Sequence, residues 1–317
     1  MTTLYRKYRP QSFADIIGQS AIKITLQNEL ITGRIAHAYL FSGPRGIGKT
    51  TIARILSRAV NCEKRSADTG EPCNECVSCK EILEGKSLDI IEIDAASHTG
   101  VEMVRAHIIE NARFTPSRLK YKVFIIDEAH MLSNASFNAL LKTLEEPPAH
   151  VIFILATTEL HKFPVTIVSR CQRFDFRRIG ESLVVERLTK LAEREGVHVE
   201  PSVLSAIARR ASGSMRDAES VLGQLFVLGT NIGWGPRDGF FGYFDQFGMS
   251  PFDLDIHPGG LSSTNPVLVP EFFSGNFDSI ELFNAKRFEL IRTPSVSEIM
   301  EFKERLDALR AADAPAA

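Results

Sequence analysis

The sequence predicts an α/β protein whose first part is a mostly parallel β-sheet wrapped by helices. Short apolar runs alternate with helical segments up to about residue 178, the pattern of successive strand-helix-strand units. One run leads into a glycine-rich loop and another ends in an acidic pair. Ligands of such sheets bind at the carboxyl ends of the strands, so both features are expected at one edge.

The expected strands are short apolar runs that end in small or polar residues. They are AYLFSG (38–43), LDIIEID (88–94), KVFIID (122–127) and VIFILATT (151–158). Beyond the sheet, helical periodicity predicts three short helices, within 181–196, 201–213 and 214–229. Pro201 opens the second of them, at a position that tolerates proline.

Composition is that of an ordinary folded protein of 317 residues with a formal net charge of −2. It provides no overall basic surface, so any nucleic-acid contact would depend on a local patch or a helix N-terminus. No apolar region follows the basic N-terminus, and no run is long enough to span a bilayer. We therefore expect a cytoplasmic location.

The first strand runs into a stretch that fits the phosphate-binding pattern G-x-x-x-x-G-K-[ST]. Its residues are Gly43, Pro44, Arg45, Gly46, Ile47, Gly48, Lys49 and Thr50, followed by Thr51 and a helical segment. Glycines let backbone amides wrap the phosphates, and the helix N-terminus adds its dipole. Lys49 is expected to reach the β and γ phosphates, and the Thr50 hydroxyl to ligate Mg²⁺.

Three further positions complete a possible phosphoryl-transfer site. Asp127 and Glu128 end a strand, where one carboxylate can hold Mg²⁺ and the other can polarise the attacking water. Thr157 ends the next strand and can orient the γ phosphate, although such threonines are commonplace. Arg170 follows a stretch expected to be extended; a lone arginine is usually a surface charge, yet phosphoryl transfer often uses a cation from outside the site.

Four of the five cysteines are spaced C-x10-C-x2-C-x2-C, at Cys62, Cys73, Cys76 and Cys79. This density suits a tetrahedral thiolate site, with zinc as the favoured metal, better than disulfides. The alternative is a set of unliganded or redox-active thiols. Cys171 has no ligand partner nearby and is expected to be a packed residue.

Together these motifs resemble a known family. YRKYRPQSFADIIGQ, HAYLFSGPRGIGKTT, the four cysteines, IEIDAASHTGVEMVR, IIDEAHMLSNASFNALLKTLEEPP, ILATTE, SRCQRFDFRRI and GSMRDAES occur in the order found in the gamma/tau subunits of bacterial DNA polymerase III. The similarity covers about residues 3–229. It implies an AAA+ fold and an ATPase that belongs to the clamp loader.

The resemblance also implies roles for individual residues. Gly43 to Thr51 would form the Walker A loop, and Asp127 and Glu128 would be the Walker B magnesium ligand and general base. Thr157 would be sensor 1. Arg170 would be an arginine finger that serves the ATP site of an adjacent subunit. Arg216 would be sensor 2, contacting phosphate from the lid.

The resemblance also implies roles for two further segments. The four cysteines would form a structural zinc module at 62–79. Tyr8, Arg9 and Pro10, with DIIGQ, would pack beside the adenine.

The implied organisation is an AAA+ nucleotide-binding domain at 1–178 and a helical lid at 179–229. The implied function is ATP-driven loading of the sliding clamp onto primed DNA at replication forks, by a hetero-oligomer expected to be a pentamer. Such a chain would be an ATPase within a DNA-directed DNA polymerase holoenzyme, without a polymerase active site of its own and without a membrane partner. The alternative is an ATP-binding assembly subunit that lacks effective hydrolysis because its collar is missing.

Other motor classes fit less well. A Holliday-junction motor has no four-cysteine insertion after the P-loop helix, and a DEAH helicase needs a second RecA-like domain. A GTPase would need an N-K-x-D motif, which the sequence lacks.

From about residue 230 the sequence departs from the family. It becomes rich in Gly, Pro and Phe, with one expected helix at about 296–311. Three interpretations stay open: a divergent accessory segment, a Phe-rich partner-binding peptide, or a reading-frame fault. Within the similar part, Ser97, His98 and Thr99 precede a helix whose N-terminus could hold a DNA phosphate, although an ordinary loop explains them equally well.

Overall fold

The computed structural model describes residues 3–97, 101–226 and 230–233. The chain divides into two compact units, each of which we describe by itself. The first comprises Met1–Val184 with Ser212–Asp217, and the second Val185–Ala211 with Ala218–Ala317. The expected helix at 296–311, the remainder of 234–317, and His98 and Thr99 lie outside the described residues.

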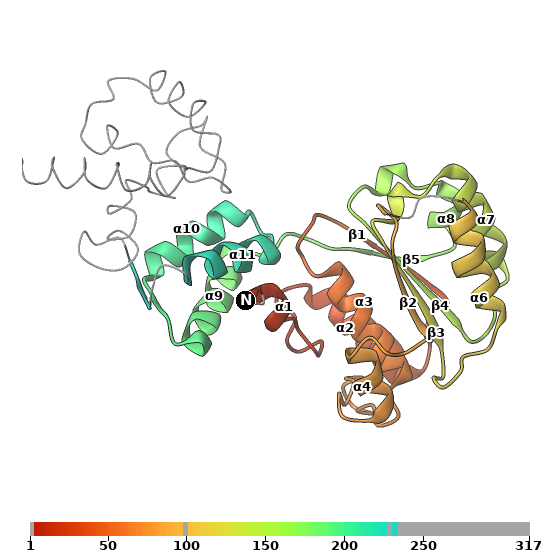
Figure 1. Ribbon diagram of the computed structural model, residues 1–317, viewed down its shortest axis with the longest axis horizontal. Helices are drawn as coiled ribbons and strands as arrows, with labels where there is room; N and C mark the ends of the chain where they lie inside the picture. Colours follow the sequence, from red (N-terminus) through yellow and green to blue (C-terminus); the bar gives the residue numbers. More distant parts are fainter. Residues whose placement is uncertain (1–2, 98–100, 227–229, 234–317) are drawn as a thin grey trace, which may run out of the picture. The chain divides into compact units, whose positions relative to one another are not determined.

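The first unit is built on a five-stranded sheet in the order β2-β3-β4-β1-β5, with every neighbouring pair parallel (Figure 1). The strands are β1 (Ala38–Ser42), β2 (Ile90–Asp94), β3 (Lys122–Asp127), β4 (Val151–Thr157) and β5 (Gln172–Asp175). The predicted parallel sheet and its four predicted strands are confirmed. Because the strands are parallel, all their carboxyl ends lie at one edge.

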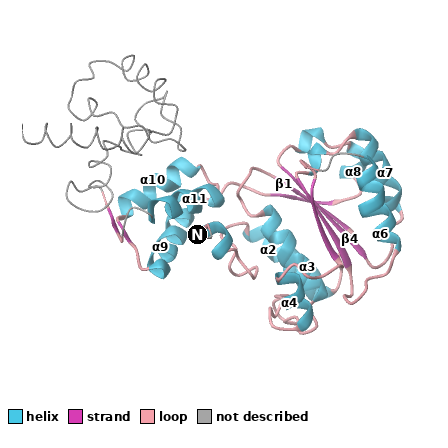
Figure 2. Cartoon of the chain, in the orientation of Figure 1, coloured by secondary structure: helices cyan, strands magenta, loops and turns pink. Residues whose placement is uncertain are grey.

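Helices cover both faces of this sheet (Figure 2). On one face α2 (Ser20–Thr32) and α3 (Lys49–Asn61) pack against Phe41 and Ile154. On the other face η1 (Val104–Ile109), α6 (Glu110–Arg113), α7 (Asn134–Glu145) and α8 (Val165–Val168) pack against Leu40 and Phe153. The three central strands, β1, β3 and β4, are mostly apolar runs because both of their faces are buried.

Shorter elements link these layers. They are α1 (Leu4–Lys7), α4 (Val77–Leu83), α5 (Val101–Met103), η2 (Ala129–Met131) and η3 (Leu160–Lys162). Among the described residues, none of the helices is long and apolar enough to cross a membrane.

The expectation of an extended stretch before Arg170 is wrong. Pro164 precedes a single helical turn, α8, and the strand β5 follows Arg170 instead. All four residues of α8, Val165, Thr166, Ile167 and Val168, are β-branched and favour a strand in isolation. Here the buried Ile167 holds the turn against the core formed by α7 and the sheet.

The three predicted helices after the sheet are confirmed as α9 (Glu181–Glu195), α10 (Pro201–Ala211) and α11 (Met215–Leu225). The second unit also contains two short parallel strands, β6 (His198–Val199) and β7 (Asn231–Ile232), which were not predicted. Inside it, Arg187 Nε lies 3.1 Å from Glu219 Oε1, and both side chains are nearly buried. Pairing of this kind offsets the cost of burying either charge.

Asp89, just before β2, anchors the loop that leads into β3. Its carboxylate is 2% exposed and accepts hydrogen bonds from the backbone N–H groups of Ser117 (2.7 Å), Arg118 (2.9 Å) and Leu119 (3.0 Å). Burial alone would raise the pKa of Asp89, but these donors outweigh it and lower the pKa. The folded state is therefore stabilised by the ionised form of Asp89.

Replacing Asp89→Asn should lower the free energy of unfolding at pH 7 by about 1–3 kcal/mol, because a buried charge-assisted hydrogen-bond set is lost. A lowered folded pKa gives stability that is present above the unfolded value, about 3.9, and is lost as the pH falls through the folded value. The difference between wild type and variant in urea denaturation should thus shrink in acid. The exposed Asp68→Asn serves as the control, and an equal loss in both variants would contradict the role of Asp89.

Candidate functional site

The loop between β1 and α3, from Gly43 to Gly48, is called the phosphate loop below. It needs glycine for two different reasons. Gly43, Gly46 and Gly48 have φ values of 142°, 76° and 101°, which side chains rarely adopt. A Cβ on Gly43 would also lie 2.5 Å from the carbonyl oxygen of Phe176, and one on Gly46 would lie 2.0 Å from Ser214 Oγ. The loop can therefore bring its backbone amides to a phosphate only with glycine at these positions.

Lys49 lies at the start of α3 with its side chain folded onto the loop. It is 6% exposed, and Nζ donates to the carbonyl oxygens of Gly43 (2.7 Å) and Pro44 (2.6 Å). Burial lowers the pKa of Lys49, against the negative charges of Glu128 and Asp127, which raise it. A cation held in this way can exchange carbonyl acceptors for phosphate oxygens.

Thr50 and Asp127, far apart in the sequence, meet at the carboxyl edge of the sheet. The Thr50 hydroxyl donates to Asp127 Oδ2 at 2.7 Å. A hydroxyl and a carboxylate in contact are the two protein ligands that Mg²⁺ takes beside bound phosphates. The structure thus brings together the two residues for which the sequence predicts a shared metal ion.

Glu128 leaves the strand with φ 45°, and its backbone N–H donates to Asp127 Oδ1 at 2.9 Å. Its carboxylate accepts a hydrogen bond from the Thr158 hydroxyl (3.1 Å) and lies 3.5 Å from Nδ1 of His130. The carboxylate of Glu128 is therefore held by two residues that the sequence analysis did not select.

Thr157 is fully buried, and its hydroxyl contacts His130 Nδ1 at 3.1 Å and accepts from the Glu159 backbone N–H at 3.0 Å. Its carbonyl oxygen accepts from the Gly43 N–H at 3.2 Å, which ties β4 to the phosphate loop. Thr158 follows the last residue of β4, and the hydroxyls of Thr157 and Thr158 contact His130 and Glu128 respectively, two groups that lie 3.5 Å apart. No sequence signal separated the two threonines.

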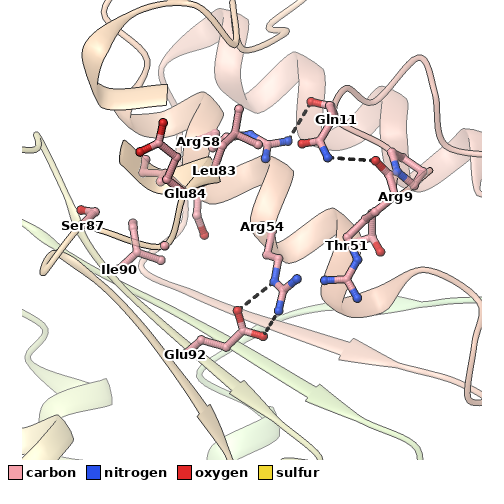
Figure 3. Close-up of a pocket in the computed structure, with 14 residues that line it drawn as sticks. Arg9, Gln11, Thr51, Arg54, Arg58, Leu83, Glu84, Ser87, Ile90 and Glu92 are labelled. Atoms are coloured by element: carbon pink, nitrogen blue, oxygen red, sulfur yellow. Dashed lines mark hydrogen bonds and ion pairs between the residues drawn. The ribbon is translucent and has the colours of Figure 1, made fainter. Parts of the chain in front are cut away.

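The remaining residues of the loop differ in exposure. Arg45 is exposed and Ile47 is buried in the core. Thr51 lines a cavity of about 490 Å³ together with Arg9 and Pro10 (Figure 3). The N-terminal segment with the implied adenine contact therefore shares a cavity with the first turn of α3.

Arg216 lies at the phosphate loop. Its backbone N–H donates to the Gly46 carbonyl at 3.2 Å, and a Cβ on Gly46 would lie 3.3 Å from the Arg216 Cβ. The side chain is exposed. Without the family resemblance, this arginine would be taken for an ordinary helix-surface charge.

Arg170 belongs to a different group of contacts. Its Nη1 donates to the Thr166 carbonyl at 2.7 Å, and Nη2 forms an ion pair with Glu145 at the end of α7. Its side chain is 32% exposed. The contacts of Arg170 within the described chain are thus with α7, α8 and the adjoining Ser169. Lys49 and Thr50 contact the phosphate loop and Asp127 instead.

The four cysteines predicted to act together are close in space. The Sγ atoms of Cys62, Cys73, Cys76 and Cys79 all lie within 4.8 Å of one another. A tetrahedral site with metal–sulfur bonds of about 2.3 Å separates its sulfurs by about 3.8 Å. Backbone N–H groups also point at the sulfurs, for example Cys73 N–H to Cys62 Sγ at 3.3 Å. The cluster can hold a metal ion, and Cys171 is not part of it.

Known proteins share both the fold and the sequence. The "Thermotoga maritima RuvB Holliday junction branch migration motor" superposes with a TM-score of 0.54 at 19% identity, over 77% of this chain and 74% of that one. This likeness shows the fold alone.

Two family models match the chain. One, "DNA polymerase III, delta subunit", matches residues 18–180. The other, "DNA polymerase III clamp loader subunit, ATPase lid domain", matches residues 183–231.

Curated relatives give closer matches. The chain is 58% identical over 229 residues to "DNA polymerase III subunit tau" of Bacillus subtilis, covering 72% of this chain and 40% of that protein. It is 50% identical over 226 residues to the tau subunit of Escherichia coli, covering 71% and 35%. The chain thus spans 35–40% of the length of these relatives. It belongs to the gamma/tau family of DNA polymerase III clamp-loader subunits.

Proposed function

We propose that this chain is an ATP-dependent motor subunit that helps to load the sliding clamp onto primed DNA in bacterial replication. The observation that carries the proposal is the contact of Thr50 with Asp127 at the phosphate loop, beside Lys49 and Glu128. The names of the tau relatives support the assignment to DNA polymerase III. Its working partners would be other clamp-loader subunits, arranged as a pentamer at cytoplasmic replication forks.

Each residue of the site has a separate task in this proposal. Amides of the loop from Gly43 to Gly48 bind the phosphates of ATP, and Lys49 neutralises their charge. Thr50 and Asp127 hold Mg²⁺, which supplies charge neutralisation across the phosphates when bound. Glu128 accepts the proton of the attacking water, while Thr157, through its bonds to Gly43 and His130, keeps β4 in register with the loop.

We further propose that Arg170 acts on the ATP of an adjacent subunit. Its contacts with Glu145 and Thr166 place it outside the Lys49–Asp127 group of its own chain. A cation supplied in trans stabilises the charge that develops on the transferred phosphoryl group. Hydrolysis would then depend on assembly of the oligomer.

The metal of the cysteine cluster is proposed to be structural zinc. Four thiolates complete a tetrahedron and leave no position for a reactive water. The domain limits 1–178, 179–229 and 230–317 stay predictions, and the fold of the last segment is not proposed.

The first test is ATP hydrolysis by the full chain, alone and with purified clamp, primed DNA and partner subunits, beside sedimentation of the same samples. We expect stimulated hydrolysis in an oligomer. Glu128→Gln should keep ATP binding and lower hydrolysis by about 100-fold or more. Lys49→Ala should weaken ATP binding by about tenfold or more, because its charge-assisted bonds to phosphate are lost.

The exposed Lys190→Ala is the matched control and should behave as wild type. A monomer that binds ATP but shows no stimulated hydrolysis would instead support the alternative, an ATP-binding assembly subunit without effective hydrolysis.

Arg170→Ala should leave ATP binding unchanged and lower stimulated hydrolysis by about a thousandfold. Mixing the variant with Lys49→Ala chains should restore activity, because intact ATP sites then meet intact Arg170 side chains. Arg173→Ala, on the neighbouring strand, is the control. Activity that does not recover in the mixture would argue against action in trans.

Metal analysis of the purified chain should find about one zinc per chain. Cys76→Ser should lower both the zinc content and the melting temperature, because metal binding stabilises the folded insertion. Cys171→Ser should change neither. A zinc content below half an equivalent, unaffected by zinc during refolding, would rule out the structural-zinc proposal.

A further inference from the structure

The short helix α1 brings Tyr5 to the arginine at the phosphate loop. The guanidinium carbon of Arg216 lies 4.8 Å from the centre of the Tyr5 ring, and that of Arg6 lies 5.7 Å from it. Both distances fall within the range in which a cation is attracted to an aromatic face. Tyr5 therefore contacts the side chain of Arg216 directly.

The backbone of Arg216 is already fixed at the phosphate loop. Its N–H bonds the Gly46 carbonyl, and Gly46 is so close to Ser214 that a Cβ there would lie 2.0 Å from Ser214 Oγ. Gly213, just before, accepts a hydrogen bond from Ile179 N–H at 3.2 Å. These contacts fix the backbone of Arg216 but do not determine the orientation of its long side chain.

The Tyr5 hydroxyl gives a second line of support for this contact. Hydrogen bonds from Thr3 and then from Arg216 lower the pKa of Tyr5 to about 8. The phenol thus interacts with Arg216 through both its ring and its oxygen, and each interaction favours one orientation of the guanidinium.

We propose that Tyr5 is a positioning residue that holds the Arg216 guanidinium beside the phosphate loop, in readiness for the phosphates of ATP. The inference rests on the proposed function, in which this loop binds ATP and Arg216 contacts its phosphates. A free arginine side chain must lose rotamer freedom when it binds a phosphate. Tyr5 restricts the Arg216 side chain before ATP binds, so ATP binding costs less side-chain entropy.

The test compares four full-length variants by calorimetric titration with Mg-ATP: Tyr5→Leu, Tyr5→Phe, Arg216→Ala and the double variant Tyr5→Leu/Arg216→Ala. Tyr5→Leu should weaken ATP binding about threefold to tenfold, and Tyr5→Phe should retain most of the affinity because it keeps the ring. Since Tyr5 acts through Arg216, the double variant should bind no more weakly than Arg216→Ala.

A spectroscopic measurement checks the contact independently of binding. The difference in ultraviolet titration between wild type and Tyr5→Phe should show a phenol that ionises at about pH 8. Repeated in the Arg216→Ala background, the midpoint should move upward, toward the ordinary value of about 10. Melting temperatures of all variants identify any that fail to fold, and Tyr5→Phe serves as the conservative substitution.

The outcomes separate the two proposals. If Arg216→Ala binds ATP as wild type does, the proposed role of Arg216 itself fails. If Arg216→Ala weakens binding and Tyr5→Leu does not, the positioning role of Tyr5 is wrong. Additive losses in the double variant would also overturn it, because Tyr5 would then act on ATP without Arg216.

Discussion

The parallel arrangement of β1, β3 and β4 is the constraint on which the site depends. Neighbouring parallel strands end at one edge, and the order β3-β4-β1 places three carboxyl ends side by side there. The phosphate loop leaves β1, Asp127 ends β3 and Thr157 ends β4. The Thr50 hydroxyl can therefore reach the Asp127 carboxylate at 2.7 Å, although the two residues lie 77 positions apart in the chain.

The segment 62–79, which contains the four clustered cysteines and is called the cysteine module here, contacts the N-terminal segment of the chain. Glu71 accepts hydrogen bonds from the backbone N–H groups of Phe13 (2.8 Å) and Ala14 (2.9 Å), and Asn74 donates to the Gln11 carbonyl at 3.1 Å. Gly70 approaches so closely that a Cβ there would lie 3.0 Å from the Gln27 carbonyl oxygen. A metal that orders the module would thus also order the segment that leads from Tyr5 and Arg9 into the domain.

Much of this arrangement could be predicted because its signals are local. Glycine spacing before a lysine, carboxylates at the end of an apolar strand, and closely spaced cysteines each specify a structure within a few residues. Four of the five strands of the large sheet followed from apolar runs of ordinary length. The helix α8 was missed because its β-branched residues favour a strand, and only the burial of Ile167 decides otherwise.

The remaining features depend on tertiary contacts that leave no local trace. Thr157 and Thr158 are identical in type and adjacent, so only the folded structure determines that Thr157 contacts His130 and Thr158 contacts Glu128. Tyr5 and Arg216 come from opposite ends of the described chain, and nothing in either segment signals their contact.

The exposure of Arg170 fits the proposal that it acts on the ATP of an adjacent subunit. Its ion pair with Glu145 joins side chains that are 32% and 49% exposed. Pairs of this kind contribute only about 0–1 kcal/mol to stability, because water screens the charges and two long side chains lose rotamer freedom. In the proposed function, a phosphate on the adjacent subunit's ATP would replace this weak contact, because charge-assisted bonds to phosphate are stronger. Separating a buried ion pair, such as that of Arg187 with Glu219, would cost much more free energy, because it would leave an unpaired buried charge.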